Sequence, residues 1–360
     1  MIIEPQRALA EIRIRVQREL TDFLAEQTQY LGEVGSELIP VAEAINAFLL
    51  ERGKRLRPLF AYCGYLAAGG RDDDPIIRAV ASLELLQACA LIHDDLIDGS
   101  DIRRGKPSIH RQFEGIHRME ELSGSATSYG ASSAILLGDL ALVWSDQMLH
   151  RSGVTDAALI RSLPVHDEMR VELMAGQFLD IHEQALATTS VARSLKIARY
   201  KSGKYTIERP LHFGASLAIA DPHVRETFID IYSEFGLPLG EAFQLRDDLL
   251  GVFGDPATTG KPAGDDLREG KRTVLMAMTH DRADAKEETI IAKYFGDPNL
   301  DQAGVDLLRT VIADTGAREH VEDLIEKLTL TALDALNRDE IEPSAHALLD
   351  ELASIAVRAN

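Results

Sequence analysis

The sequence predicts an all-α fold, and three observations support this prediction. Apolar residues recur at helical spacing through almost all of the 360 residues. No sustained alternation of apolar and polar residues bounded by turn residues is present, as a strand would require. Aromatic residues make up only 6% of the chain, whereas Ala, Leu, Glu and Arg, which lose little conformational freedom in helices, are frequent.

The helical periodicity divides the chain into segments separated by turn chemistry. The breaks include Gly69-Gly70, Gly153, Asp221-Pro222 and the segment 254–270. The predicted helices span residues 6–30, 40–52, 55–68, 75–98, 131–151, 156–186, 191–202, 205–219, 224–253, 273–280, 285–295, 302–314, 317–337 and 343–358.

The domain organisation is predicted to be simple. No linker rich in Pro, Gly or Ser divides the chain, and no short-period repeat is visible. We therefore expect a single domain over residues 1–360, with an N-terminal helix within 1–37. The polar stretch 114–128 is expected to be a surface excursion, of loop character, between two helices.

Charge and composition exclude several classes of function. The net charge of −20 repels nucleic-acid phosphates, so nucleic-acid binding is not expected. Phosphate chemistry would need local cations, either Lys and Arg clusters or metal ions. Cys63 and Cys89 lie in apolar helical patterns and predict buried thiols in a reducing cytoplasm. The N-terminus lacks the apolar core of a signal peptide, and Asp139 interrupts the longest apolar run, so no membrane span is expected.

The most informative motif is Leu-Ile-His-Asp-Asp-Leu-Ile-Asp at residues 91–98. Asp94 and Asp98 are four residues apart, so both carboxylates lie on one face of the predicted helix. Like charges at this spacing repel each other unless a cation lies between them, and carboxylate oxygens suit Mg²⁺. An acidic, solvated helix end is the alternative, but the apolar residues on both sides disfavour it.

Two basic clusters predict binding of phosphate groups. Arg103, Arg104 and Lys106 surround Gly105 in a turn directly after the acidic motif. Guanidinium groups bind diphosphate oxygens in a bidentate manner, and the glycine allows a tight turn. A second cluster, Gly-Lys-Arg-Leu-Arg-Pro at 53–58, opens a predicted helix at the end that favours anions.

A second acidic pair, Asp247-Asp248, lies far downstream in a predicted helix. It is followed by Gly-Lys-Pro at 260–262 and by Asp-Asp-Leu-Arg-Glu-Gly-Lys-Arg-Thr at 265–273. Carboxylates on a helix followed by lysines on a loop form a surface suited to metal and phosphate. Two such sets in one domain suggest a shared site for Mg²⁺ and diphosphate.

These motifs resemble those of the trans-isoprenyl diphosphate synthases, or polyprenyl synthetases, most closely the bacterial geranylgeranyl diphosphate synthases. The resemblance extends from about Leu38 to the last predicted helix. It implies an all-α isoprenoid-synthase bundle around a deep central cavity, a homodimer and three Mg²⁺ ions. The implied reaction joins isopentenyl diphosphate to an allylic diphosphate, which is dimethylallyl, geranyl or farnesyl diphosphate.

The resemblance also implies roles for individual residues. The catalytic set is Asp94, Asp95, Asp98, Lys201, Asp247 and Asp248, of which Asp94, Asp98 and Asp247 match metal ligands. The residues matching the isopentenyl diphosphate site are Lys54, Arg57, Gln87 and Arg104. Those matching the allylic site are Arg103, Lys201, Ser202, Gln244, Lys261 and Lys271. Gln177 and Asp180 match a polar pair lining the cavity.

The sequence departs from the family pattern at two positions of the site. Gly251 replaces the usual last aspartate of the second motif, which puts the support of the third metal ion in doubt. Ser202 stands where Thr is common and keeps the hydroxyl group. The excursion at 114–128 is also longer than in many members.

The chemistry implied by this set of residues needs no side-chain nucleophile. Concentrated positive charge on the leaving diphosphate favours ionisation to an allylic carbocation, which the alkene of isopentenyl diphosphate attacks. By resemblance, the departing diphosphate then accepts a proton. We expect His93 and His110 to serve in packing or hydrogen bonding rather than as bases.

Product length is predicted from the helix that precedes the first motif. Ala90 and Cys89 lie about one turn before Asp94, and Leu86 lies deeper. In family members that stop at fifteen carbons, one or both matching positions are commonly aromatic, whereas both are small here. This predicts geranylgeranyl diphosphate as the main product, with longer prenyl or farnesyl products as alternatives. Small residues selected only for close helix packing are the other explanation.

Two other functions are compatible with parts of this pattern. A class I terpene cyclase also uses an aspartate-rich helix and Mg²⁺, but it needs cations for one diphosphate site rather than two. A regulatory subunit of a heteromeric synthase would have lost metal aspartates or basic residues, which are nearly all present here. The sequence leaves open the pathway and any transient membrane contact that would take up the product.

Overall fold

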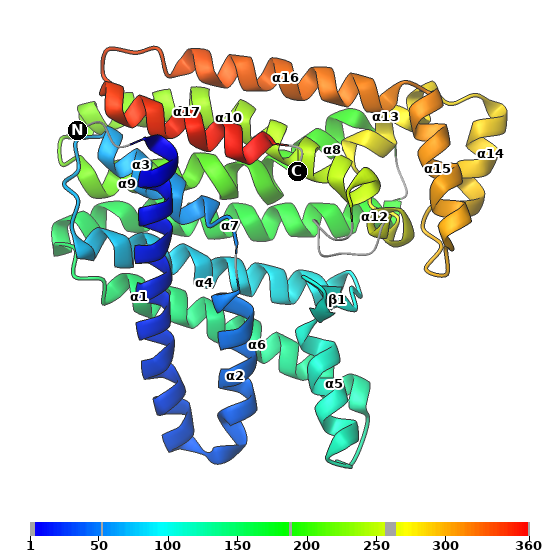
Figure 1. The fold of residues 1–360 in the computed structure, drawn as a ribbon, viewed down its shortest axis with the longest axis horizontal. Coiled ribbons are helices and arrows are strands. Elements are labelled where there is room, and N and C mark those ends of the chain that lie inside the picture. The colour runs from blue at the N-terminus through cyan, green and yellow to red at the C-terminus, as the bar shows by residue number, and fades with distance from the viewer. Residues whose placement is uncertain (1–3, 52, 187–188, 256–263, 359–360) are drawn as a thin grey trace. The chain divides into compact units, whose positions relative to one another are not determined.

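The computed structural model describes residues 4–51, 53–186, 189–255 and 264–358. The described chain is helical almost throughout, as predicted, and contains one short hairpin (Figure 1). It divides into two compact units, Met1–Tyr62 with Arg71–Leu159, and Cys63–Gly70 with Ile160–Asn360.

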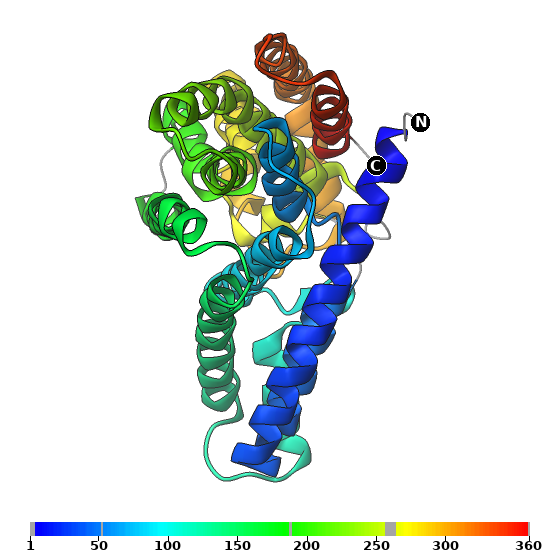
Figure 2. The same cartoon turned by 90° about the vertical axis from the view of Figure 1, so that its left-hand side faces the viewer.

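The first unit is built around one buried helix. Its elements are α1 (Pro5–Val34), the 3₁₀ turn η1 (Ser36–Leu38), α2 (Ile39–Leu50), the start of α3 (Leu56–Ala67), α4 (Asp74–Ile97), β1 (Ile102–Arg103), β2 (Lys106–Pro107), α5 (Ile109–Met119), α6 (Ala126–His150) and the start of α7 (Asp156–Leu186). Helices α1 and α2 form an antiparallel pair (Figures 1 and 2). Helix α4 packs against both α1 and α6, and most of its side chains are buried. It is therefore the core helix of this unit.

Close packing of α4 on α6 depends on Gly138. A Cβ atom at Gly138 would lie 2.8 Å from Cε1 of His93, so only glycine lets the imidazole ring rest on the α6 backbone. The ring's Nε2 lies 3.1 Å from the Ile135 carbonyl oxygen. This contact fixes the side chain directly before the first acidic motif and gives His93 the packing role that was predicted.

The second unit contains the longer helices of the C-terminal half. Its elements are the end of α3, the rest of α7, α8 (Val191–Ile197), the π-helix η2 (Ala198–Glu208), α9 (Arg209–Ala218), α10 (Pro222–Phe253), α12 (Asp265–Glu269), α13 (Val274–Arg282), α14 (Ala285–Tyr294), α15 (Gln302–Asp314), α16 (Ala317–Ala335) and α17 (Pro343–Val357). Apolar residues of α10, α12, α13, α15 and α16 form one buried cluster, which includes Leu245, Leu267 and Leu275.

The helix starts follow from local sequence signals. The Asp73 carboxylate accepts a hydrogen bond from the Ile76 amide at the start of α4, and Pro75 stands in the first turn. Asp221 caps α10 in the same way. Asp284 and Glu287 form a reciprocal capping box at α14. These caps explain why periodicity located most helices to within a few residues.

Four local features differ from the prediction, and one of them is the short helix α12, which lies within the predicted break 254–270. Helix α5 was not predicted, and it covers residues 114–119 of the expected excursion 114–128, whose last residues 126–128 begin α6. Glu114 is buried because Arg111 and Arg118 bind its carboxylate, each at 2.5 Å. Only the connection between the two helices is a loop. Residues 198–208 form a π-helix, and residues 102–107 form a two-stranded hairpin.

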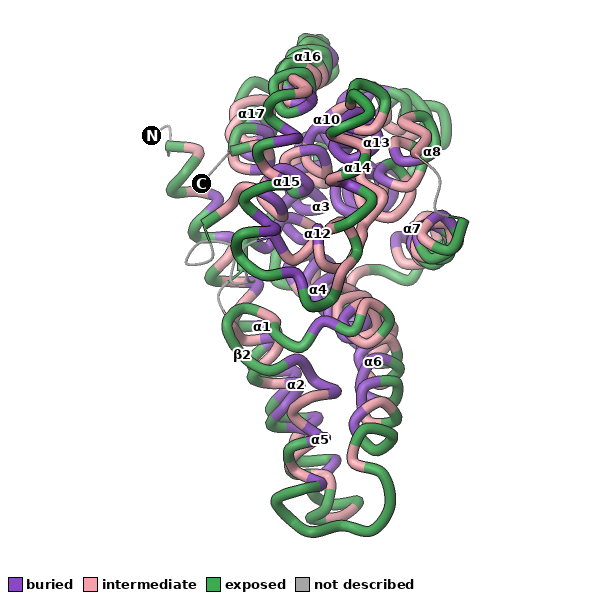
Figure 3. The backbone as a smooth tube through the Cα atoms, turned by 90° about the vertical axis from the view of Figure 1, so that its right-hand side faces the viewer, coloured by how far each residue is buried: buried purple, intermediate pink, exposed green. Residues whose placement is uncertain are grey.

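Two helices of the described chain are long and apolar enough to cross a membrane by composition alone. In α4, 72% of the apolar window is buried, as expected of a core helix. In α6 only 28% is buried, and Figure 3 shows exposed residues along this helix. The exposed apolar side chains of α6 therefore differ from those of a core helix such as α4.

Candidate functional site

The C-terminal end of α4 carries the first acidic motif, and its three aspartates have different surroundings. Asp95 is buried, with 1% of its surface exposed, and both of its carboxylate oxygens lie 2.8 Å from Nε of Arg103. Asp94 lies 3.9 Å from the same guanidinium group. Asp98 ends the helix, and its amide donates to the Asp94 carbonyl at 2.8 Å. Asp95 therefore anchors Arg103, while Asp94 and Asp98 lie one turn apart, as predicted.

The cationic turn after this motif is the hairpin of β1 and β2. Arg104 and Gly105 both have positive φ angles, 52° and 75°, which is the geometry of a type I′ hairpin turn. The Arg104 guanidinium donates to the Phe48 carbonyl at 3.3 Å and lies 5.8 Å from the centre of the Phe48 ring. Burial, followed by the charges of Arg103 and Arg55, lowers the pKa of Arg104. Positive charge is thus concentrated here, as an anion site requires.

The cations of the basic segment at 53–58 differ in burial. Arg55 is buried and binds the buried Glu84 of α4 at 2.5 Å. It also donates to Gln17 at 2.9 Å, and its φ angle of 52° lies in the left-handed region. Lys54 is exposed beside it. Arg55 therefore holds the turn in place, and a lone glutamate within the apolar α4 sequence was the signal that a buried partner existed.

The residues predicted for isopentenyl diphosphate come together in part. The Arg104 Nη2 atom lies 3.9 Å from the position that a Cβ of Gly53 would take, so the hairpin adjoins the turn that carries Lys54. On α4, Gln87 is half-buried, and its Oε1 atom is buried without a hydrogen-bond partner among the described residues. Buried polar atoms are rarely left without a partner, so this position suits a ligand site.

The predicted chain-length residues differ in accessibility. Leu86 and Cys89 have 0% exposure, and the Cys89 sulfur lies 3.8 Å from Nδ1 of His93. Ala90 is half-buried and is therefore the only one of the three with accessible surface. His110 is buried, and its Nδ1 lies 3.1 Å from the Ser108 hydroxyl, which agrees with a structural role.

In the second unit, the second acidic motif ends α10. Asp247 is exposed, whereas Asp248 is buried and accepts a hydrogen bond from Gln244 at 2.7 Å. Burial, together with the nearby charges of Asp266 and Asp247, raises the pKa of Asp248 to about 8. Lys271 lies 3.4 Å from Asp266. The predicted residues Gln244, Asp247, Asp248 and Lys271 are thus brought together here, while Lys261 lies outside the described residues.

The π-helix η2 presents the predicted residues Lys201 and Ser202. Lys201 Nζ lies 2.6 Å from Oδ2 of Asp180 on α7, which connects it with the predicted polar pair Gln177 and Asp180. A Cβ atom at Gly176 would lie 2.7 Å from the Lys201 Cα, so the two backbones touch. π-Helical turns are frequent at functional sites. The amphipathic pattern of a π-helix resembles that of an α-helix, so η2 could not be predicted from the sequence.

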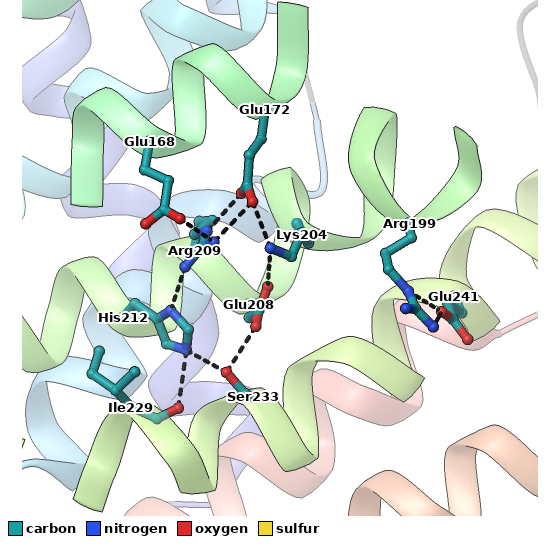
Figure 4. Close-up of polar contacts among 10 residues, drawn as sticks. All are labelled: Glu168, Glu172, Arg199, Lys204, Glu208, Arg209, His212, Ile229, Ser233 and Glu241. Carbon is teal, nitrogen blue, oxygen red and sulfur yellow. Dashed lines mark hydrogen bonds and ion pairs between the residues drawn. The ribbon is translucent and has the colours of Figure 1, made fainter. Parts of the chain in front are cut away.

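A buried polar network that sequence analysis missed surrounds the end of η2 (Figure 4). The Glu172 carboxylate of α7 binds Arg209 at 2.7 Å and Lys204 at 2.5 Å. Arg209 Nη1 donates to Nδ1 of His212 at 3.2 Å, and the opposite ring nitrogen donates to the Ile229 carbonyl at 3.1 Å. Burial and the charge of Arg209 lower the pKa of His212 to about 3, so the ring is neutral.

Within each unit, then, the structure assembles a set of carboxylates and cations from segments far apart in the sequence. The first set combines the end of α4 with the β1–β2 hairpin and the turn at 53–55. The second set combines the end of α10 with α12 and the lysine that follows it. Carboxylates of this kind hold hard divalent cations, and the neighbouring Lys and Arg side chains bind phosphate oxygens.

Comparisons with known proteins all indicate the same protein family. The family described as polyprenyl synthetase matches residues 40–311. A geranylfarnesyl diphosphate synthase of Aeropyrum pernix is 32% identical over 290 residues, which cover 79% of this chain and 83% of the relative. A geranylgeranyl diphosphate synthase of Sulfolobus acidocaldarius is 27% identical over 312 residues, which cover 85% of this chain and 86% of that relative.

Among solved structures, a geranylgeranyl pyrophosphate synthase from Corynebacterium glutamicum has a TM-score of 0.92 and 42% sequence identity. The superposition covers 97% of this chain and 99% of the other, which was crystallised with isoprenyl diphosphate and magnesium.

Proposed function

We propose that this chain, which belongs to the polyprenyl synthetase family, produces geranylgeranyl diphosphate as its main product. The chain is a chain-elongating trans-prenyltransferase, as its relatives are. Its substrates in this proposal are isopentenyl diphosphate and the allylic diphosphates with five, ten and fifteen carbons. The product proposal is supported by the small residue Ala90, whose surface is partly accessible one turn before Asp94.

One observation carries the site assignment: the hairpin that holds Arg103 and Arg104 is fastened to Asp95 within the first acidic motif. Cations and carboxylates are thereby held at fixed positions in one place. A metal-bound diphosphate requires this combination, because its oxygens are shared between cations of the protein and the metal.

The donor groups fit Mg²⁺, which prefers carboxylate oxygen and retains water and phosphate ligands. Asp94 and Asp98 would hold two ions, and Asp247 would hold a third. Burial and the neighbouring charges of Asp266 and Asp247 raise the pKa of Asp248. A cation beside this motif would offset the repulsion between these carboxylates. When bound, the ions would add positive charge to the leaving diphosphate.

The side chains would divide the remaining work. Lys54, Arg57 and Arg104 bind isopentenyl diphosphate, and Gln87 of α4 belongs to the same proposed site. Lys201, Ser202, Gln244 and Lys271, with Arg103, bind the allylic diphosphate. The allylic C1–O bond breaks, and the diphosphate leaves with the electron pair. The alkene carbon of isopentenyl diphosphate forms the new C–C bond, and the diphosphate accepts the proton that restores a double bond.

A homodimer is also part of this proposal. On α7, the apolar residues Val171, Met174, Phe178 and Ile181 form an exposed stripe at helical spacing. On α6, Leu136 is 66% and Val143 is 59% exposed. Exposed apolar stripes of this kind mark protein interfaces. We further propose that residues 1–360 act as one catalytic domain in the cytoplasm, where the two buried thiols remain reduced.

Product analysis tests the proposed function. Purified protein is incubated with Mg²⁺, isopentenyl diphosphate and each allylic starter in turn, and the chain lengths of the products are identified. A twenty-carbon main product is expected. A twenty-five-carbon product would favour the second candidate, for which the relative from Aeropyrum pernix argues. Absence of any elongated product would refute the prenyltransferase assignment of the site.

Steady-state kinetics of variants test the proposed assignment of cations to the two diphosphate sites. Lys54→Ala and Arg57→Ala should raise the Michaelis constant for isopentenyl diphosphate more than that for the allylic substrate, because each removes a cation from one site only. Lys201→Ala and Lys271→Ala should have the reverse effect. Equal effects of all four variants on both substrates would show that the partition is wrong.

A further inference from the structure

One carboxylate of α7 binds two cations of the neighbouring helix (Figure 4). Oε1 of Glu172 lies 2.5 Å from Nζ of Lys204 in η2, and it accepts a hydrogen bond from Nη2 of Arg209 at 2.9 Å. Oε2 accepts another from Nε of Arg209 at 2.7 Å. The three side chains are at most 13% exposed. They therefore form a largely buried bridge between α7 and the C-terminal end of η2.

The spacing of the two cations matches a π-helical turn and not an α-helical one. Lys204 and Arg209 are five residues apart, and the Arg209 amide donates to the Lys204 carbonyl, which is the hydrogen bond of a π-helix. Side chains five residues apart in an α-helix point about 140° away from each other, because each residue turns that helix by about 100°. In a π-helical turn they lie almost one above the other. A single carboxylate therefore binds both side chains most directly when this turn is π-helical.

The length of η2 indicates that its surroundings stabilise it. π-Helical turns mostly occur singly within α-helices, whereas η2 extends over 11 residues. Helices in proteins obtain most of their stability from tertiary packing, so a long stretch of this rare conformation depends on its neighbours. Helix α7 contacts η2 at Lys204 through Glu172 and at Lys201 through Asp180. The two carboxylates of α7 therefore hold both parts of η2.

The form of the turn at 204–209 decides where Lys201 points. A π-helical hydrogen bond spans one residue more than an α-helical one, so conversion of this turn to an α-helix would rotate the preceding residues by about 100° about the helix axis. Lys201 Nζ, which lies 2.6 Å from Oδ2 of Asp180, would then leave that carboxylate. The position of Lys201 therefore depends on a turn that Glu172 holds.

We propose that Glu172 is a positioning residue for the allylic site. By binding Lys204 and Arg209 together, it selects the π-helical turn that directs Lys201 toward the allylic diphosphate. This inference rests on the proposed function, in which Lys201 binds that diphosphate. Glu172 itself contacts neither substrate in this proposal and acts through the backbone of η2.

The test compares two glutamates of α7 that share Arg209 as a partner. Glu172→Gln keeps the volume and removes the charge. It should raise the Michaelis constant for the allylic substrate on the order of 10- to 100-fold, as a misplaced binding group does, and leave that for isopentenyl diphosphate unchanged. Glu168, one turn earlier, is 54% exposed and binds Nη2 of Arg209 at 2.8 Å, so Glu168→Gln removes an Arg209 contact but keeps the link to Lys204. This control should leave both Michaelis constants unchanged. Equal effects of the two variants, or equal changes for both substrates, would overturn the proposal.

Lys204→Met provides a second measurement, which holds even if Glu172→Gln does not fold. It removes the other end of the bridge and leaves Glu172 bound to Arg209, and thermal unfolding confirms that the variant is folded. The Michaelis constant for the allylic substrate should again rise selectively. The double variant should add little to either single change, because both remove the same interaction. A normal allylic Michaelis constant in folded Lys204→Met, or full additivity in the double variant, would contradict the proposed role of Glu172.

Lys201→Ala separates this inference from the proposed function. Calorimetry with Mg²⁺ and geranyl thiolodiphosphate, in which sulfur replaces the bridging oxygen and slows cleavage, measures allylic binding without turnover. If Lys201→Ala weakens this binding while Glu172→Gln and Lys204→Met leave it intact, only the positioning role is wrong. If Lys201→Ala has no effect, the allylic assignment of Lys201 fails, and this inference fails with it.

Discussion

At the scale of single residues, Ala90 and Cys89 are neighbouring positions predicted to limit the length of the product, and they differ in burial. The Ala90 side chain is half-buried, whereas Cys89 is fully buried. Phenylalanine at Ala90 would extend into accessible space beside the first motif, while phenylalanine at Cys89 would overpack the core at a cost of about 1–3 kcal/mol. The neighbouring positions should therefore respond differently to the same substitution.

Ala90→Phe should shift the main product toward fifteen carbons and leave the unfolding temperature close to that of the wild type. Cys89→Phe should lower the unfolding temperature. Product chain lengths and thermal unfolding measure both effects, and Ala90→Ser serves as the conservative control. An unchanged product spectrum from an active Ala90→Phe enzyme would mean that Ala90 does not face the growing chain.

A second prediction at this scale concerns His212. Its pKa in the folded state is about 3, because of burial and the Arg209 charge, whereas its usual value in an unfolded chain is near 6.5. The lowered pKa stabilises the fold fully above pH 6.5, and this contribution is lost as the pH falls toward 3. Lys204 and Glu172 also act on the ring, with smaller effects.

Denaturant unfolding at several pH values measures this effect. Between pH 7 and pH 5 the wild type should lose about 2 kcal/mol through His212, and His212→Gln should lack that part of the loss. His223→Gln, at an exposed position at the start of α10, is the control and should keep the wild-type dependence. Parallel pH profiles of His212→Gln and the wild type would contradict the prediction.

At the scale of the element, the π-helix η2 depends on glycines in the long helices beside it. Gly176 of α7 lies against the Lys201 backbone, and Gly240 of α10 lies against Gly203, where a Cβ would come within 2.5 Å of the Gly203 Cα. The network around Glu172 and Arg209 then fixes the C-terminal end of η2 (Figure 4). Lys201 is therefore positioned by backbone contact on two sides.

Gly176→Ala should displace η2, because the new Cβ would meet backbone atoms rather than a flexible side chain. We expect a loss of about 1–3 kcal/mol in stability and a larger rise in the Michaelis constant for the allylic substrate than for isopentenyl diphosphate. Gly32→Ala in α1, where no atom lies within 4 Å of the new Cβ, should be neutral or stabilising. Equal kinetic changes for both substrates would separate Gly176 from the allylic site.

At the scale of the whole molecule, the exposed stripe on α7 argues for self-association. Phe178 is 66% exposed in this stripe, and a charge placed there would remain buried and unpaired in a dimer. Phe178→Glu should therefore yield monomers in sedimentation and light-scattering measurements. Leu330→Glu, at a 62% exposed position on α16, should keep the wild-type mass. A monomeric wild type would remove the dimer from the proposal.

The sequence by itself determined the helical class, most helix boundaries and the two acidic motifs. These features depend on local periodicity, caps and the i, i+4 spacing of carboxylates, all of which are written in neighbouring residues. Helix α5, which was not predicted, has a buried Glu114 whose partners include Thr127 from the next helix at 3.0 Å. A pattern along one helix does not contain that contact.

Only the tertiary structure decided which charged residues face inward. It directs Arg55 to Glu84 and Asp95 to Arg103, and it brings Asp266 against Gly251 from a separate helix. A side chain's partner depends on how distant segments approach each other, and burial makes that choice energetically decisive because an unpaired buried charge costs several kcal/mol. The glycine at 251 is a gap in the sequence motif, but in the folded chain its space is filled.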